Sequence, residues 1–460
     1  MFDSGSAHRL TTSWDTNTYT ADQIVYNQLE PIRARAREQS RNNDYVARMI
    51  QVLQNNVVGE NGFKLRSQVM DFNGAADLPV RKLIETAWGE YADYSDLVEL
   101  CDLIISGLIT DGEVFIYHRM SEDGLMPQIL DPVLIDVSYN QESRNGPRIV
   151  MGIEYDLQMR PIAYHVNDSY EGYHPGVGHT ATASKPRTRI PAEQVTHLFK
   201  KLYVGQKRGL PWLAQSLGRL FQLGRYEEAA LTAARIGAAK MGFFRSNDND
   251  EYTGDEESGD MQLNAEAGTF ENIGGLEFQQ FDPSYPAGEF DGFMTKTLKG
   301  IASGLGVDYH TLGNDLSGVN YSSARVGMLE TREYYKKIQA WITRKFIKPL
   351  YRQWLARELL ANTLRIKDRP LNRGLFYYLP ATFVGRRWEW VDPQKEANAK
   401  RIQYEMRITS LSQIIRERGD DPDEVFQEIA EEIKLLNKLG INPAQVLEKM
   451  EAQDGEEDND

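Results

Sequence analysis

The sequence predicts an α+β protein that is predominantly helical and divided into several domains. The chain has 460 residues, more than a single domain usually contains. Apolar residues recur at helical spacing over most of its length, and strand-like patterns occur mainly between about residues 113 and 199. Hydrophobic residues make up 41% of the chain and charged residues 26%, which are ordinary values for a globular protein.

Two helical regions are expected before residue 110. Residues 1–25 are polar and have few apolar anchors, so we expect a mobile N-terminal arm. The spacing of apolar residues predicts one helix from about residue 22 to 54, which Asn55, Asn56 and Gly59 would end. It predicts another helix over residues 79–110.

A strand-rich region follows. Its segments are rich in β-branched and aromatic residues and are bounded by Gly, Pro, Asn and Asp. The expected strands are residues 113–118, 128–137, 149–157, 161–166 and 194–199. The third and fourth of these should pair as a hairpin, because only a short turn separates them.

Two helices are then expected on either side of a polar, acidic segment. The first begins near Pro211, which suits the first helical turn, and the second covers about residues 289–305. The first carries a run of small residues that would let another helix approach closely: Ala229, Ala230, Ala233, Ala234, Gly237 and Ala238. On the second, Lys296, Lys299 and Ser303 share the face opposite an apolar stripe. The segment between them should be irregular or β.

The remainder of the chain is predicted to be helical apart from its loops. Residues 307–322 should form a polar loop that is longer than a plain helix–helix connection needs. A long helix from residue 323 to about 360 should be kinked by Pro349. Four short helices should follow residue 392, the third between Asp421 and Gly440 and the fourth from Asn442, before an acidic tail over residues 451–460.

The sequence contains no recognisable catalytic, cofactor or metal site. There is no phosphate-binding loop, no dinucleotide-binding fingerprint and no nucleophile elbow. His174 and His179 lack a third soft ligand nearby, and the single Cys101 sits in an apolar helical pattern typical of a buried thiol. No apolar stretch is long enough for a membrane helix. The chain is therefore expected not to be an enzyme and to need no cofactor.

The charge balance argues against tight binding of nucleic acid. The net charge is −15 at pH 7, whereas a protein that grips DNA usually presents a basic face that displaces counterions. The same charge is compatible with a surface past which DNA slides without sticking.

Several stretches, taken in order, resemble the lambda-type family of phage portal proteins. The most specific is residues 306–325, which contain GVDYHTL and LSGVNYSSAR. Shorter agreements are RNN at 41–43, NNVVG at 55–59, DGEV at 111–114, GIEYD at 152–156, PIAYH at 161–165, RGLPW at 208–212, WVDP at 390–393 and LSQII at 411–415. The resemblance covers about residues 30–440 and departs at the acidic segment 247–259 and at the acidic tail.

The resemblance implies a portal fold with parts called wing, stem, clip and crown, assembled as a ring. The wing would comprise residues 26–205 and 323–392, the latter including the long kinked helix. The two stem helices would be residues 206–242 and 288–306, with the clip at 243–287 between them. Residues 307–322 would be the tunnel loop, 393–450 the helical crown, 1–25 the arm and 451–460 the tail.

The resemblance also implies the function and the partners. In this family the ring usually has twelve copies and lies at one vertex of the capsid. Double-stranded DNA would be packaged and ejected through it without sequence specificity. The partners would be terminase, a head–tail connector, and capsid and scaffold proteins; the protein would reside in the virion and be assembled in the host cytoplasm. The residues expected to line the tunnel are Lys296, Lys299, Ser303, Asn314, Asp315, Ser317 and Asn320.

Two alternatives of other classes stay open at this point. One is a different phage structural ring, such as a head–tail adaptor, although such chains are typically much shorter. The other is a DNA-acting enzyme whose site is not recognisable from the sequence.

Overall fold

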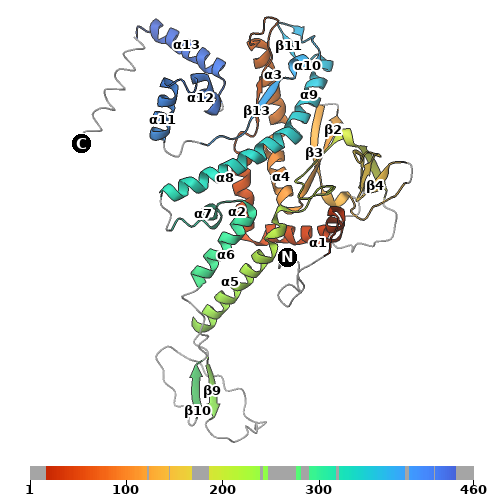
Figure 1. Cartoon of the computed structure of the whole chain (residues 1–460), viewed down its shortest axis with the longest axis vertical. Helices are drawn as coiled ribbons and strands as arrows, with labels where there is room; N and C mark the ends of the chain where they lie inside the picture. Colours follow the sequence, from red (N-terminus) through yellow and green to blue (C-terminus); the bar gives the residue numbers. More distant parts are fainter. Residues whose placement is uncertain are drawn as a thin grey trace, which may run out of the picture. The chain divides into compact units, whose positions relative to one another are not determined.

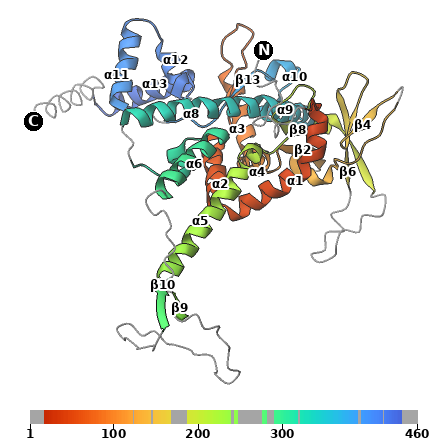
Figure 2. The same cartoon turned by 60° about the horizontal axis from the view of Figure 1, so that its bottom comes forward.

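The computed structural model of the chain divides into two compact units. Unit 1 comprises Met1–Ala214 and Gly306–Asp460, and unit 2 comprises Gln215–Leu305. The structure describes residues 17–121, 124–143, 146–167, 186–238, 242–246, 276–280, 290–317, 321–388, 393–418 and 420–441. Figure 1 shows the elements in chain order, and Figure 2 shows them from a second direction.

Unit 1 begins with two helices rather than the single helix expected over residues 22–54. Helix α1 (Ala21–Asn42) starts at a capping box formed by Thr20 and Gln23, so residues 21–25 of the expected arm are helical. The chain leaves the helical conformation at Asn43, whose side chain then caps α2 (Asp44–Leu53). The side-chain oxygen of Asn43 accepts the backbone N–H groups of Tyr45 and Val46, which are free at the start of α2.

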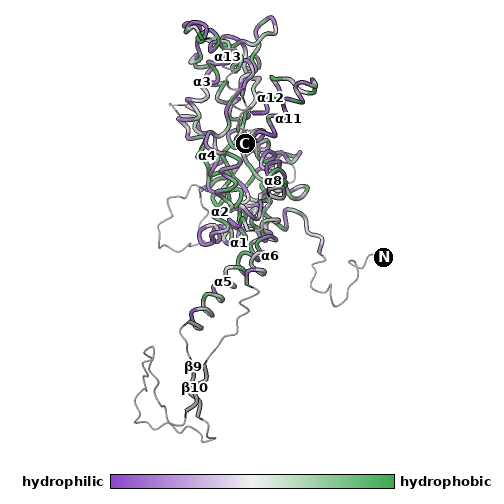
Figure 3. The backbone as a smooth tube through the Cα atoms, turned by 90° about the vertical axis from the view of Figure 1, so that its left-hand side faces the viewer, coloured by the Kyte–Doolittle hydropathy of each residue, from purple (hydrophilic) through white to green (hydrophobic). Residues whose placement is uncertain are grey.

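The helix expected over residues 79–110 is also two helices, α3 (Leu78–Tyr94) and α4 (Leu97–Thr110). The break falls at Asp96, which adopts a left-handed backbone conformation with φ of 46°. Helix α4 packs against α1, α2, α3 and β2 (Glu113–Ser121) and is the centre of unit 1. Its apolar residues are correspondingly buried, and Figure 3 shows hydrophobic (green) chain gathered around α2 and α4.

Two antiparallel sheets follow α4. The first has the order β3-β2-β8, formed by Gly124–Leu130, Glu113–Ser121 and Val195–Phe199. The second has the order β4-β5-β6-β7, formed by Arg148–Val150, Ile153–Tyr155, Pro161–Asn167 and Arg187–Pro191. An apolar cluster that includes Phe115, Ile135, Ile153 and Tyr164 forms the core of this region.

The sheets confirm the expected hairpin and change the bounds of two expected strands. Strand β5 pairs with β6, as predicted. The single strand expected over residues 149–157 is instead a hairpin of β4 and β5, because Met151 and Gly152 both take positive φ angles and form the turn. The strand expected over residues 128–137 ends at Leu130, where Asp131 and Pro132 begin a short 3-10 helix.

The pairings made by the C-terminal part of unit 1 were not predicted from the sequence. Strand β1 (Lys64–Ser67) pairs with β13 (Ala381–Val384), more than 300 residues away, and β11 (Arg365–Ile366) pairs with β12 (Arg369–Pro370). Strands this short carry little periodicity, and only the folded chain brings β1 and β13 together.

The expected long helix is present and is interrupted where its kink was predicted. It consists of α8 (Tyr321–Ile342), a π-helical turn (Thr343–Ile347) and α9 (Lys348–Ala361). Pro349 occupies the start of α9, where its missing N–H is tolerated because the wide turn before it already interrupts the α-helical pattern. Helix α9 packs its Tyr351 and Trp354 against Trp88 of α3. The short helix α10 (Leu375–Tyr378) follows.

Three helices follow residue 392, as the sequence predicts. They are α11 (Pro393–Glu405), α12 (Leu411–Arg418) and α13 (Pro422–Lys438). Asp421 caps α13, and Gly440 follows its end with φ of 73°, so both predicted boundaries are confirmed. A fourth helix expected from Asn442 and the acidic tail 451–460 lie outside the described residues.

Unit 2 contains two helices and a two-stranded ladder. Helix α5 (Leu217–Ala238) starts later than expected, because the residues just before it, Trp212–Gln215, form a 3-10 turn. Helix α6 (Phe290–Leu305) has the predicted bounds to within a residue. Between them β9 (Gly242–Ser246) pairs with β10 (Leu276–Gln280), so the intervening segment is partly β; residue 242, expected at the end of the helix, is in a strand.

Candidate functional site

The cationic face of α6 is present as predicted from its spacing. Lys296, Lys299 and Ser303 are all exposed. The opposite face of α6 is buried through Met294, Leu298, Ile301, Ala302 and Leu305. The apolar stripe therefore fixes the orientation of the helix within unit 2 and leaves the two lysines facing solvent.

Two glycines of α6 lie against side chains at and just before the start of α5. A Cβ placed on Gly300 would lie 2.6 Å from Nη1 of Arg219, whose flexible side chain could move aside. A Cβ placed on Gly304 would lie 2.9 Å from Oγ of Ser216.

None of the four described small residues that were singled out on α5 is fully buried within the single chain. Ala229 and Ala234 are exposed, and Ala230 and Ala233 are half-buried. The adjacent Leu231 is 61% exposed. Gly237 and Ala238 lie within α5, but their surroundings are outside the description. The described part of α5 thus offers a flat, weakly polar surface.

The segment 307–322, expected to be a long polar loop, begins with an ordered helical turn. Asp308 accepts a hydrogen bond from the backbone N–H of Thr311 at 3.0 Å and starts α7 (Tyr309–Gly313). The turn ends at Asn314, which takes the left-handed conformation with φ of 49°. Arg48 of α2 donates to the Thr311 carbonyl oxygen at 3.2 Å, which ties this turn to unit 1.

Asp315 holds the chain just after α7. Its carboxylate accepts the Tyr309 hydroxyl at 2.7 Å and the Ser317 backbone N–H at 2.9 Å, and His310 Nδ1 lies 2.8 Å from its carbonyl oxygen. Hydrogen bonds from Ser317 and Tyr309 lower the pKa of Asp315 to about 2. Asp315 is therefore an anion with a local structural role, while Asn314 and Ser317 are exposed; Asn320 lies outside the described residues.

A buried ionic cluster surrounds Glu113, which belongs to the DGEV stretch at residues 111–114. This side chain is fully buried at the start of β2. Its carboxylate is 2.8 Å from Arg33 Nη2, 2.7 Å from Arg208 Nη2 and 3.0 Å from His197 Nε2. It also accepts the backbone N–H of Gly209 at 2.9 Å. Arg208 in turn donates to the carbonyl oxygens of Ile135 and Met151.

Two glycines allow two segments of backbone beside this cluster to come into direct contact. A Cβ on Gly112, whose φ is 81°, would lie 2.1 Å from the carbonyl carbon of Leu210. A Cβ on Gly209 would lie 2.1 Å from the Gly112 carbonyl oxygen. The DGEV stretch (111–114) and the RGLPW stretch (208–212) are therefore in direct backbone contact. Each contributes one glycine, Gly112 or Gly209, at a point where a side chain would collide with the other stretch.

The electrostatics of the cluster favour a charged, permanently paired carboxylate. Burial alone would raise the pKa of Glu113, but Arg208, His197 and Arg33 outweigh burial and lower it well below its usual value. Burial lowers the pKa of His197 despite its bond to Glu113, so the imidazole is neutral. Every oxygen of Glu113 is occupied by the protein itself, which points to a structural anchor rather than a reacting group.

The described residues offer no other chemical centre. They contain no group of three or more His, Cys, Asp or Glu side chains arranged to hold a metal ion. Cys101 is buried, and burial raises the pKa of its thiol, so it is not a reactive nucleophile. None of the helices that the structure describes is long and apolar enough to cross a membrane.

Comparison with known proteins gives a consistent result. The family model described as "Phage portal protein, lambda family" matches residues 7–339. The chain is 32% identical to a "Probable portal protein" of Halomonas phage phiHAP-1, over 95% of this chain and 86% of the relative. It is 21% identical to "Portal protein B" of Escherichia phage lambda, over 94% of this chain and 88% of that protein. A chain in the virion of a native gene transfer agent particle aligns over 88% of this chain and its own full length, with 13% identity and a TM-score of 0.43.

Proposed function

Because the chain belongs to the lambda family of phage portal proteins, we propose that it assembles as a closed homo-oligomeric ring of twelve subunits at one capsid vertex. The observation that carries this proposal is the family match over residues 7–339, together with portal-named relatives that align along almost the whole chain. The ring would be the channel through which double-stranded DNA enters during packaging and leaves during ejection.

Exposed residues of α5 are compatible with assembly into a ring. Ala229, Leu231 and Ala234 are exposed, and with about 3.6 residues per turn they lie at different positions around the helix. A neighbouring copy could approach α5 closely where its exposed side chains are small. Repetition of such a head-to-tail contact around an axis closes into a ring.

The lysines of α6 and the segment after it are proposed to face the channel. Lys296 and Lys299 would give sparse, transient contacts with phosphates, while Asp315 would add to the acidic character that keeps DNA from sticking. Asn314 and Ser317 would present polar groups to the passing duplex. The net charge of −15 supports weak rather than tight binding.

The proposed partners follow from the same role. Terminase would supply the ATP-driven motor, a head–tail connector would dock on the ring, and capsid and scaffold proteins would surround it during assembly in the host cytoplasm. The mature protein would be part of the virion.

The proposal predicts that the purified protein neither hydrolyses ATP nor cuts DNA, because the sequence has no phosphate-binding loop and the buried carboxylate at Glu113 is fully occupied. The measurement is phosphate release and plasmid nicking by purified protein. Activity that copurifies with the chain through every purification step would contradict a purely structural role.

A further inference from the structure

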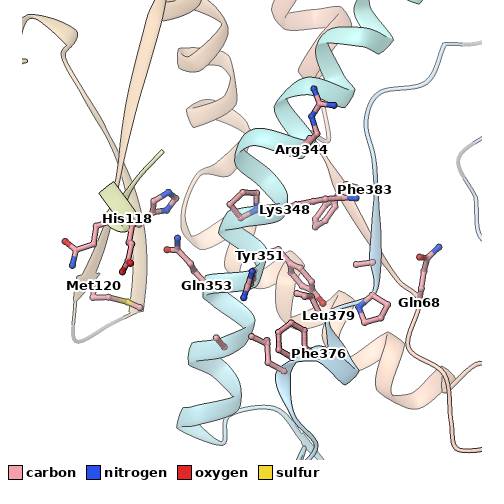
Figure 4. Close-up of a pocket in the computed structure, with 18 of the residues that line it drawn as sticks. Gln68, His118, Met120, Arg344, Lys348, Tyr351, Gln353, Phe376, Leu379 and Phe383 are labelled. Carbon is pink, nitrogen blue, oxygen red and sulfur yellow. The ribbon is translucent and has the colours of Figure 1, made fainter. Parts of the chain in front are cut away.

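A groove in unit 1 is lined by none of the residues that have been assigned to the channel. It has a volume of about 1350 Å³ and is bordered by β2, the π-helical turn with α9, and the segment from α10 to β13. Figure 4 shows α9 running through the middle of the groove, with His118 and Met120 of β2 on one side and Phe376, Leu379 and Phe383 on the other.

A row of cations follows one side of α9 along this groove. Arg344, Lys348 and Arg352 are four residues apart, so they lie one above another on the same helical face. All three are exposed, and no carboxylate among the described residues forms an ion pair with them. Glu193 is the sole acidic side chain in the lining, so the groove has a net positive charge.

One buried side chain of the groove lining is only partly paired. His118 is only 4% exposed, and its Nδ1 has no hydrogen-bond partner among the described residues. Its Nε2 is 2.7 Å from the Thr196 hydroxyl. The case for a ligand therefore rests on the cations and the apolar walls of the groove.

The rest of the lining resembles a peptide site rather than a phosphate site. Tyr351, Phe376, Leu379 and Phe383 give it apolar walls beside the cations. Aromatic and apolar walls of this kind bury side chains, whereas a DNA backbone needs only the charges. The groove therefore suits a segment with apolar residues close to several carboxylates.

The chain itself ends with such a segment. Residues 442–460 contain Val446, Leu447 and Met450 and then six acidic residues within positions 451–460. We propose that the groove along α9 binds this C-terminal acidic segment, from the same chain or from a neighbouring copy. The acidic run 247–259 follows two phenylalanines, Phe243 and Phe244, but it belongs to unit 2, whereas the groove and the C-terminal segment both belong to unit 1.

Tethering explains how a groove on an acidic protein can select an acidic peptide. The net charge of −15 repels a free polyanion at long range. A segment that is covalently attached reaches the groove at a high effective concentration, which outweighs that repulsion. The contact depends on exposed charges, so it weakens as the salt concentration rises.

The test is zero-length cross-linking of the full chain with a water-soluble carbodiimide, followed by mass spectrometry. Carboxylates of residues 451–460 should couple to Lys348 several-fold more often than to Lys345, which is also exposed but does not line the groove. The double variant Arg344→Gln/Arg352→Gln keeps Lys348 and should lose these cross-links. The control Arg365→Gln/Arg369→Gln changes two exposed arginines outside the groove and should keep them.

Three results would overturn the assignment. Equal coupling of Lys345 and Lys348 would show that the contact is random, and coupling of Lys348 mainly to residues 247–259 would assign the groove to another segment. If instead a short DNA duplex bound the full chain, and Lys348→Glu but not Lys345→Glu weakened that binding, the groove would be a nucleic-acid site.

Discussion

At the scale of single residues, Glu113 shows how one buried charge organises several segments. It joins α1 through Arg33, β8 through His197 and the chain before α5 through Arg208 and Gly209. Such a cluster contributes little relative to an apolar core of the same shape, but removing one partner leaves the others unpaired. Its value to the fold lies in fixing which segments meet.

Replacement Glu113→Gln should destabilise unit 1 by about 3–5 kcal/mol, because two buried guanidinium groups lose their counter-ion. Chemical denaturation followed by fluorescence measures this loss. The control Glu154→Gln removes a carboxylate paired with the half-exposed Arg189 and should cost less than about 1 kcal/mol. Equal losses in the two variants would show that the cluster is not an anchor.

The cost of Glu113→Gln should also depend on pH in a defined direction. The folded pKa of Glu113 is lowered, so the stability that it contributes is present above its unfolded pKa of roughly 4.3 and is lost as the pH falls further. The difference between wild type and variant should therefore be constant near neutrality and shrink in acid.

The contact between Gly112 and Leu210 makes a second residue-scale prediction. Gly112→Ala should abolish soluble folding, because its Cβ would lie 2.1 Å from the Leu210 carbonyl carbon. Gly74→Ala is the matched control, since Gly74 has nearly the same φ, 80°, and no atom within 4 Å of the added Cβ. Soluble yield and thermal midpoint compare them. If both variants behaved alike, backbone strain rather than close approach would explain the glycine.

At the scale of elements, the sequence predicted most of the long helices and the approximate positions of the main strands along the chain. It failed where a polar side chain interrupts a continuous helical pattern. Asn43 and Asp96 divide two expected helices, and neither changes the apolar spacing on which the prediction rests. The strands β1 and β13 were missed because their pairing depends on contacts across the whole of unit 1.

The sequence predicts those features of the candidate site that depend on helical spacing, and not those that depend on contacts within the fold. The exposed lysines of α6 follow from helical spacing alone. The order imposed on the expected loop does not, because it depends on Asp315 accepting hydrogen bonds from Tyr309 and Ser317. The joining of the DGEV and RGLPW motifs around Glu113 required the fold.

The segment after α7 carries the element-scale prediction. Replacing residues 314–319 by a short Gly-Ser link should leave ring assembly intact, because α7 is held by its Asp308 cap and by Arg48. The same change should impair packaging or retention of DNA in an infection complementation assay. Asp315→Asn, which keeps the length of the segment, is the control and should have a smaller effect. Normal packaging by the replacement variant would remove the assigned channel role, and failure of ring assembly would make the segment structural.

At the scale of the whole molecule, charge and surface together explain how a channel protein avoids binding its cargo. The chain has a net charge of −15, and its few exposed cations on α6 are sparse. Twelve copies around an axis would multiply that acidic character. Such a surface repels DNA on average while the lysines permit brief contacts.

The measurement that tests the central claim most directly is electron microscopy of the purified full chain, with light scattering on the same sample. The account predicts closed rings with a central channel and a mass near twelve times the 52.5 kDa of one chain. A population that stays monomeric at 52.5 kDa across protein and salt concentrations, or that forms open filaments instead of rings, would contradict it.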